Sequence, residues 1–195
     1  VGLVVFSFRQ GGITLSEAGV QSVAAANSRL YVQTSGDFNL RQPGSIQSGL
    51  ALSNQTNAPV TVGLELVNLD GRSTGLNGTI TVPANGQVSR FLTEIPGLSG
   101  VPKPFQGILR ITSSGVNVIG LRARYNEVGT FLITTTSPVD EAAQASPVEL
   151  LFPHFVDGGG YTTEFILFSS QPGQTPNGTL RFYDQAGRGL NIRLR

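Results

Sequence analysis

The sequence predicts an all-β fold with two β-sandwich units, the second of which is split between the two ends of the chain. Three observations lead to this prediction. Short runs of β-branched and aromatic residues recur at a spacing of about ten residues, which is typical of sandwich strands. Turn-forming Gly, Pro, Asn and Asp residues separate these runs. One long stretch of the sequence also occurs twice.

The repeat relates the middle of the chain to its C-terminal end. Residues 49–76 align without a gap on residues 165–192, and Gly71 falls on Gly187, a constant offset of 187 − 71 = 116 positions. The first copy continues into further strands. The second copy ends at Arg195, so the rest of its strands are expected elsewhere.

The missing strands of the second copy resemble the start of the chain. Residues 30–36 (LYVQTSG) match residues 109–115 (LRITSSG). A half-unit at each end leaves strands without partners, and strands with unpaired edges pair readily with other chains. This organisation indicates assembly.

The individual strands are predicted from apolar alternation between turn signals. About seven of them lie in the central unit, which gives it immunoglobulin-like proportions. The expected strands are 1–8, 29–34, 48–53, 60–67, 79–82, 87–92, 107–112, 116–124, 131–135, 162–168, 178–183 and 190–194. The expected core of the central unit is Leu50, Leu52, Leu64, Leu66, Val88, Leu109, Ile111, Ile119, Leu121 and Leu132.

These signals divide the chain into four parts. Residues 37–138 are expected to form a complete sandwich, and residues 139–149 a linker. Residues 150–195 are expected to be the C-terminal half of the split sandwich. Residues 1–36 would supply the strands that complete it, either in a neighbouring subunit or in the same chain.

The first strand is the expected joining element. It is apolar on both faces, with Leu3 and Val5 on one and Val4, Phe6 and Phe8 on the other, so it is expected to be a central strand covered on both sides. Three arrangements satisfy this: the strand folds back within its own chain, inserts into the next subunit, or belongs to one period of a longer polypeptide. We favour insertion, because a head-to-tail contact that does not close generates a filament. The predicted joining residues are Val1, Leu3, Val4, Val5, Phe6 and Phe8.

Composition limits the classes of partner. Charged residues make up 13% of the chain, the net charge is +1, and Lys103 is the single lysine, which argues against nucleic acid as a partner. The chain contains no cysteine, so a disulfide framework and a cysteine-based metal site are excluded. No apolar run approaches the length of a membrane span. The chain begins at Val1 and contains no methionine, so we expect a processed or partial chain whose export signal has been removed, and a secreted or cell-surface location.

A family resemblance supports this location. The stretches PFQGILRI (104–111), IGLRARYNE (119–127), FPHFVDGGGYTTEFILF (152–168) and GTLRFYDQAG (178–187) resemble tandem immunoglobulin-like β-sandwich repeats of large secreted bacterial proteins. The resemblance implies an extracellular repeat without recognised catalysis. The order differs from such arrays, in which a piece like residues 3–36 follows the piece like residues 178–194.

The chemical inventory favours a protein that is not an enzyme. His154 is the only histidine, lies between aromatic residues and is expected to be structural. The carboxylates are scattered singly, and no catalytic or phosphate-binding motif occurs. We therefore predict no catalytic residues, no cofactor and no metal ion.

Two kinds of surface chemistry remain open. Arg110, Arg122 and Arg124 could line one sheet face and bind an anionic glycan, although outward arginines are more often simply solvated. Three Asn-X-Thr triplets lie in predicted turns and are candidate glycosylation sites. Their acceptor residues are Asn54, Asn77 and Asn177.

Two functional classes follow. The first is an extracellular structural protein whose copies join head to tail by strand complementation into a filament or surface array. The alternative is a secreted adhesion or carbohydrate-binding accessory module of a larger protein. Glycan-binding modules usually present aromatic platforms, and this chain has no tryptophan and only 4 tyrosines, which favours the first class.

Overall fold

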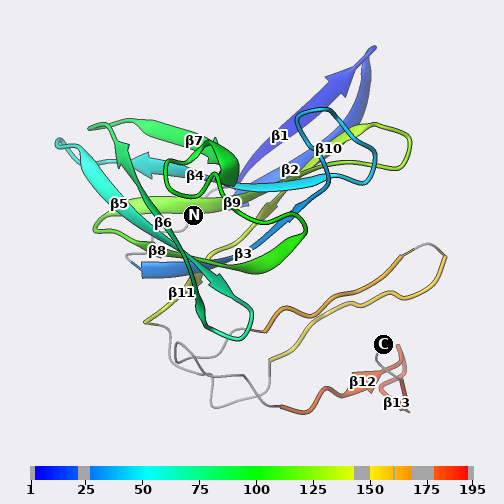
Figure 1. Cartoon of the computed structure of the whole chain (residues 1–195). Helices are drawn as coiled ribbons and strands as arrows, with labels where there is room; N and C mark the ends of the chain where they lie inside the picture. The colour runs from blue at the N-terminus through cyan, green and yellow to red at the C-terminus, as the bar shows by residue number, and fades with distance from the viewer. Residues whose placement is uncertain (1–2, 22–26, 143–149, 160, 168–177, 193–195) are drawn as a thin grey trace.

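The computed structural model describes residues 3–21, 27–142, 150–159, 161–167 and 178–192. These residues form antiparallel strands and one short 3₁₀ turn, η1 (Leu92–Glu94), and the described part of the chain contains no α-helix (Figure 1). The predicted all-β fold is confirmed.

Eight strands form a β-sandwich. One layer has the order β10-β9-β4-β7 and the other the order β3-β8-β5-β6. The layers join at one corner, where Thr34 of β3 lies opposite Gln47 of β4. The strands are β3 (Asn27–Ser35), β4 (Ile46–Asn54), β5 (Val60–Asn68), β6 (Ser73–Val82), β7 (Gln87–Phe91), β8 (Phe105–Thr112), β9 (Val116–Tyr125) and β10 (Phe131–Thr136).

The core lies between the two layers, and most of its predicted members are there. Leu50, Leu52, Leu64, Leu66, Leu109 and Ile111 are buried in it, and Val88 packs against it half-buried. Ile119 is buried outside this cluster, and Leu121 and Leu132 are only half-buried.

One set of core residues was not predicted. Leu92, Ile95, Leu98 and Val101 lie in and after η1 and close the side of the sandwich between β7 and β8. Apolar residues in a loop give no periodic signal, so sequence patterning does not identify them.

The structure corrects the start of the sandwich from residue 37 to residue 27. Strand β3 pairs with β8 from Asn27, opposite Thr112, to Thr34, opposite Phe105. Leu30 lies directly opposite Leu109, and both side chains are fully buried. The sequence match noted above therefore relates neighbouring strands of one sheet, which share a pattern because they bury the same face.

The sandwich also ends later than predicted, because its last strand lies within the expected linker of residues 139–149. The two-residue strand β11 (Val139–Asp140) pairs with the beginning of β3, with Asp140 opposite Ser28. The amide of Glu141 then donates a hydrogen bond to the carbonyl of Asn27, at 3.0 Å. The chain thus enters and leaves the sandwich at adjacent points. Residues 143–149 lie outside the described part.

The N-terminal residues form a β-hairpin of β1 (Leu3–Gln10) and β2 (Ile13–Gln21). The turn consists of Gly11 and Gly12, both at positive φ, which glycine adopts without steric cost. β2 was not predicted, because its centre, SEAG, has low β-propensity.

The C-terminal residues contain much less strand than expected. Among the described residues after Leu150, β12 (Phe182–Tyr183) pairs with β13 (Gly189–Leu190) around the predicted turn at Gly187, and one isolated bridge joins Gly158 to Tyr161. The expected strand 162–168 is absent over residues 162–167, which are not in any ladder. A ladder of two short strands is marginally stable by itself, because three or more strands are needed for an independently stable sheet.

Candidate assembly surfaces

The hairpin is attached to the sandwich through β2, which lies beside the edge strand β10 (Figure 1). The attachment uses side chains in place of a backbone ladder. The Ser16 hydroxyl accepts a hydrogen bond from the Ile133 amide at 3.0 Å and donates one to the Ile133 carbonyl at 2.7 Å. The Thr135 hydroxyl donates to the carbonyl of Gly19. The edge of β10 is therefore covered by β2, which is one way in which proteins protect an edge strand.

Aromatic packing continues this contact. The rings of Phe8 and Phe131 meet edge to face with centroids 5.1 Å apart. Tyr125 lies 5.6 Å from Phe131, and Phe38 lies 5.2 Å from Tyr125 and 5.4 Å from Phe91. Such pairs contribute about 0.5–1.5 kcal/mol each beyond their buried area. The row holds one face of the hairpin to the outer face of the sandwich layer that contains β10.

The other face of the hairpin and the outer edge of β1 are open. Val5 is 57% exposed, and Ser7 beside it donates a hydrogen bond to the exposed Glu17. Among the described residues, β1 pairs with β2 alone. The single chain does not itself cover both faces of this strand: Phe6 and Phe8 are half-buried, whereas Val5 is exposed. Val1 and the side chains of Leu3 and Val4 lie outside the described part.

The C-terminal segment exposes many apolar side chains. Leu151, at 85% exposure, is the most exposed of them. Edge-to-face contacts join Phe152 to Phe165 and Phe155 to Phe182, at 5.4 and 5.1 Å between centroids. The exposed apolar residues of this segment are Leu150, Leu151, Phe152, Val156, Tyr161, Leu167, Tyr183 and Leu190. Leu150, Leu151 and Phe152 are exposed at consecutive positions, and soluble monomers rarely expose large contiguous apolar patches.

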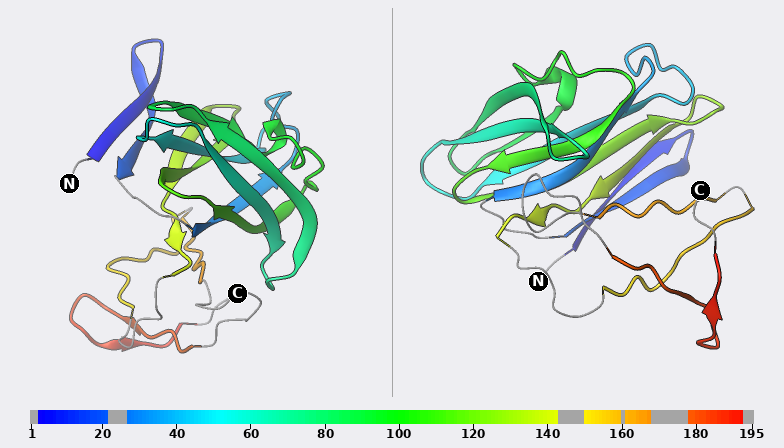
Figure 2. Two further views of the ribbon diagram at one scale, coloured as in Figure 1. Left: turned by 90° about the vertical axis from the view of Figure 1, so that its left-hand side faces the viewer. Right: turned by 60° about the horizontal axis from the view of Figure 1, so that its bottom comes forward.

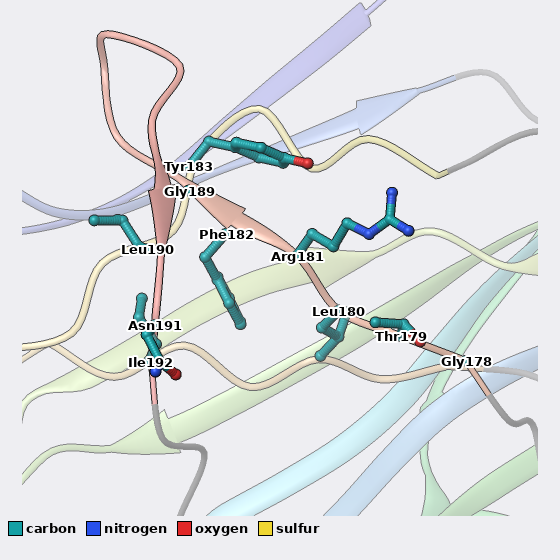
Figure 3. A pocket seen from close by; sticks show the side chains of 10 residues that line it. All are labelled: Gly178, Thr179, Leu180, Arg181, Phe182, Tyr183, Gly189, Leu190, Asn191 and Ile192. Carbon is teal, nitrogen blue, oxygen red and sulfur yellow. The ribbon is translucent and has the colours of Figure 1, made fainter.

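The arms of the β12–β13 hairpin border an open hollow of about 590 Å³ (Figure 3). Leu180 and Phe182 point to one side of their arm, and Arg181 and Tyr183 point to the other (Figure 3). Such alternation of apolar and polar side chains is typical of a strand whose apolar side packs against a second layer. In this structure the Phe182 ring packs on Phe155 and Phe165, with centroids 5.1 and 6.0 Å apart.

The hairpin and the C-terminal segment lie apart. The left-hand view of Figure 2 shows β1–β2 at one end of the molecule and β12–β13 at the other. No ladder among the described residues joins β1 to any residue after Leu150. Closure of the split unit within one chain is not seen in this structure.

The C-terminal segment approaches the sandwich near β3 and β9. Burial raises the pKa of the Tyr31 phenol, and the negative charge of Glu164 raises it further. Burial, followed by the charge of Arg124, lowers the pKa of Arg122, whose guanidinium donates to Gln33 at 2.8 Å. The Tyr31 hydroxyl is buried without a hydrogen-bond partner among the described residues.

The three arginines proposed for glycan binding do not form one surface. Arg110 lies on β8 and is held by two carboxylates, with Nη1 3.0 Å from Glu65 and Nε 2.8 Å from Glu141. Arg122 and Arg124 lie on β9, in the other layer. Arg110 thus links Glu141, which directly follows β11, to Glu65 on β5.

The candidate glycosylation sites differ in their exposure to solvent. Asn54 is 2% exposed, and its amide group donates to the carbonyls of Ala58 and Pro83 at 2.8 and 3.0 Å. A glycan at Asn54 is excluded, because it would occupy the interior. Asn77 is exposed, within β6 and not in a turn as predicted. Asn177 lies outside the described part.

His154 is exposed, so its expected structural place between aromatic residues is not observed. Within the described ranges, no three His, Asp or Glu side chains lie close enough to hold a metal ion. The described residues also include no helix long and apolar enough to cross a membrane.

Comparisons with known proteins add little. No family model matches the chain, and no curated protein matches it. A crystal structure of Thermotoga maritima 1070 aligns with a TM-score of 0.46 and 12% identity, over 60% of this chain and 94% of that chain. At this score the likeness carries no argument about function.

Proposed function

We propose that this chain is a non-enzymatic structural protein whose copies join head to tail by strand complementation, forming an extracellular filament or surface array. One observation carries the proposal. The described part of the C-terminal segment exposes eight large apolar side chains, and its only ladder is the two-residue pairing of β12 with β13. Exposed apolar surface of this kind marks an interaction site.

The N-terminal hairpin supplies the complementary element. It projects from one side of the sandwich, and the outer edge of β1 pairs with no other strand among the described residues. An edge that can accept another strand is what strand addition requires. Because donor and acceptor lie apart on one chain, joining them between chains repeats without closing, which generates a filament. The resemblance to repeats of secreted bacterial proteins supports an extracellular place.

The test introduces a charge at the outer edge of β1. Val5→Lys is expected to reduce polymers to monomers, because a buried lysine without a partner is costly at a strand interface. The matched control is Ile13→Lys, since Ile13 is 65% exposed on the same hairpin but lies next to its turn. Light scattering and electron microscopy measure the outcome.

Polymers of the unaltered chain and of Ile13→Lys, together with monomers of Val5→Lys, would support the proposal. Two results would overturn it. One is an unaltered chain that stays monomeric at high concentration. The other is a Val5→Lys chain that polymerises as the unaltered chain does.

A further inference from the structure

The intact sandwich is an internal template for the split unit. The repeat places residues 49–54 of β4 in register with residues 165–170, at the offset of 116 positions. In the intact sandwich, β4 has β9 on one edge and β7 on the other. The corresponding C-terminal stretch has no ladder partner in residues 162–167. The place of β7 is therefore vacant beside it.

β1 matches the vacant strand. Aligning residues 3–8 (LVVFSF) on residues 87–92 (QVSRFL) superposes Val4 on Val88 and places Val5 in the position of Ser89 and Phe6 in that of Arg90. In the template, Ser89 lies opposite Ala51. Adding the offset to Ala51 gives 51 + 116 = 167, which is Leu167.

Resting on the function proposed above, we infer that β1 of one copy pairs antiparallel with residues 166–167 of a second copy, with Val5 opposite Leu167 and Phe6 opposite Ile166. Val5 and Leu167 are both exposed in the single chain, the latter at 42%. Directly opposed side chains in an antiparallel pair contact each other, so the pairing covers each with the other.

The free edge of β1 permits this pairing without loss of the existing contacts. β2 lies between β1 and the sandwich edge, so the unpaired edge of β1 faces away from its own β10. A three-stranded sheet of β2, β1 and the partner's strand results. Three strands are also the smallest sheet that is stable without a further layer.

The template also limits the ladder at one end. A Cβ at Gly49 would overlap the carbonyl oxygen of Arg90, so β7 approaches β4 there only because the residue is glycine. The equivalent position in the second copy is Phe165. The close approach cannot be repeated, and the inferred pairing therefore starts at Ile166.

The absence of cysteine makes the register directly measurable by disulfide formation. Val5→Cys and Leu167→Cys chains are mixed and oxidised, and non-reducing gels report the covalent dimer. Directly opposed residues have Cα atoms about 4.5–5.5 Å apart, inside the range that a disulfide spans. The register control mixes Ser7→Cys with Leu167→Cys. A shift of two residues places that pair outside the range, so a several-fold lower yield is expected.

The outcomes separate this inference from the proposed function. A stronger yield from the Ser7 pair, or assembly without a crosslink from either pair, overturns the register and leaves head-to-tail assembly standing. A chain that does not assemble overturns both. A double variant, Val5→Cys with Leu167→Cys, that gives only an internally crosslinked monomer shows closure within one chain and also overturns the inference.

Discussion

Asn54 illustrates how one residue can satisfy a modification motif and yet serve packing alone. Its Oδ1 accepts hydrogen bonds from the amide and hydroxyl of Thr56, the residue that completes the triplet. Its Nδ2 holds the carbonyls of Ala58 and Pro83, which belong to two different turns. The triplet is therefore a structural clasp between the β4–β5 and β6–β7 connections. Sequence alone does not distinguish the two roles, because both place Asn next to a turn.

Asn54→Ala is expected to lower the free energy of unfolding by about 2–4 kcal/mol, because it leaves buried carbonyl groups without donors. Asn77→Ala is the matched control, since Asn77 belongs to the same kind of triplet but is exposed on β6. We expect that change to stay within about 0.5 kcal/mol. Urea unfolding of the two variants measures the difference, and equal losses would contradict the clasp.

At the level of elements, the sequence predicts strands well where buried and exposed residues alternate. It predicts them poorly where a strand is attached to the sandwich through a few side-chain hydrogen bonds, as β2 is. Seven of the eight sandwich strands need only small adjustments of their bounds, and β6 extends back from residue 79 to Ser73. β2 is missed, because Ser16, Ala18 and Gly19 are polar or small. These residues permit close approach to β10, a reason that depends on tertiary contact and leaves no periodic signal.

Ser16→Ala is expected to loosen the hairpin from β10, because the hydroxyl serves both backbone groups of Ile133. The loss is expected to be about 1–2 kcal/mol of local stability. Amide hydrogen exchange at Ile133 should accelerate by about tenfold, which is what 1.4 kcal/mol corresponds to. Ser7→Ala is the control, since Ser7 bonds only the exposed Glu17. Unchanged protection of Ile133 in the Ser16 variant would contradict the attachment.

For the whole molecule, the sequence predicts the all-β class and the central core, while the domain bounds and the candidate glycan surface differ from the structure. The bounds were misplaced because β3 and β8 resemble each other as neighbours, and sequence similarity does not separate neighbours from repeated equivalents. The sequence is compatible with Arg110, Arg122 and Arg124 lying on one face of a sheet. In the structure, Arg110 and Arg122 lie in different layers of the sandwich. The spacing of residues along the sequence does not show to which layer of the sandwich each strand belongs.

The fragment 27–142 is expected to fold alone with a cooperative unfolding transition, because every residue of the core cluster lies within it. The fragment 150–195 is expected to remain without stable structure, since the pairing in its described part is limited to the two-residue ladder of β12 with β13 and one isolated bridge between Gly158 and Tyr161. Circular dichroism with urea unfolding measures both. A cooperative transition in the second fragment, or its absence in the first, would contradict this division.

The adjacency of entry and exit has a mechanical consequence. The chain enters at Asn27 and leaves at Glu141, and one backbone hydrogen bond of 3.0 Å joins these two residues. Tension applied through the flanking segments meets at that point, where it acts on the short β11–β3 pairing and on the Arg110–Glu141 ion pair. Because the force passes through these contacts at the edge of the sandwich, the core carries little of the load. A pulled chain would peel open β11 first and leave the sandwich folded until the ends of β3 separate.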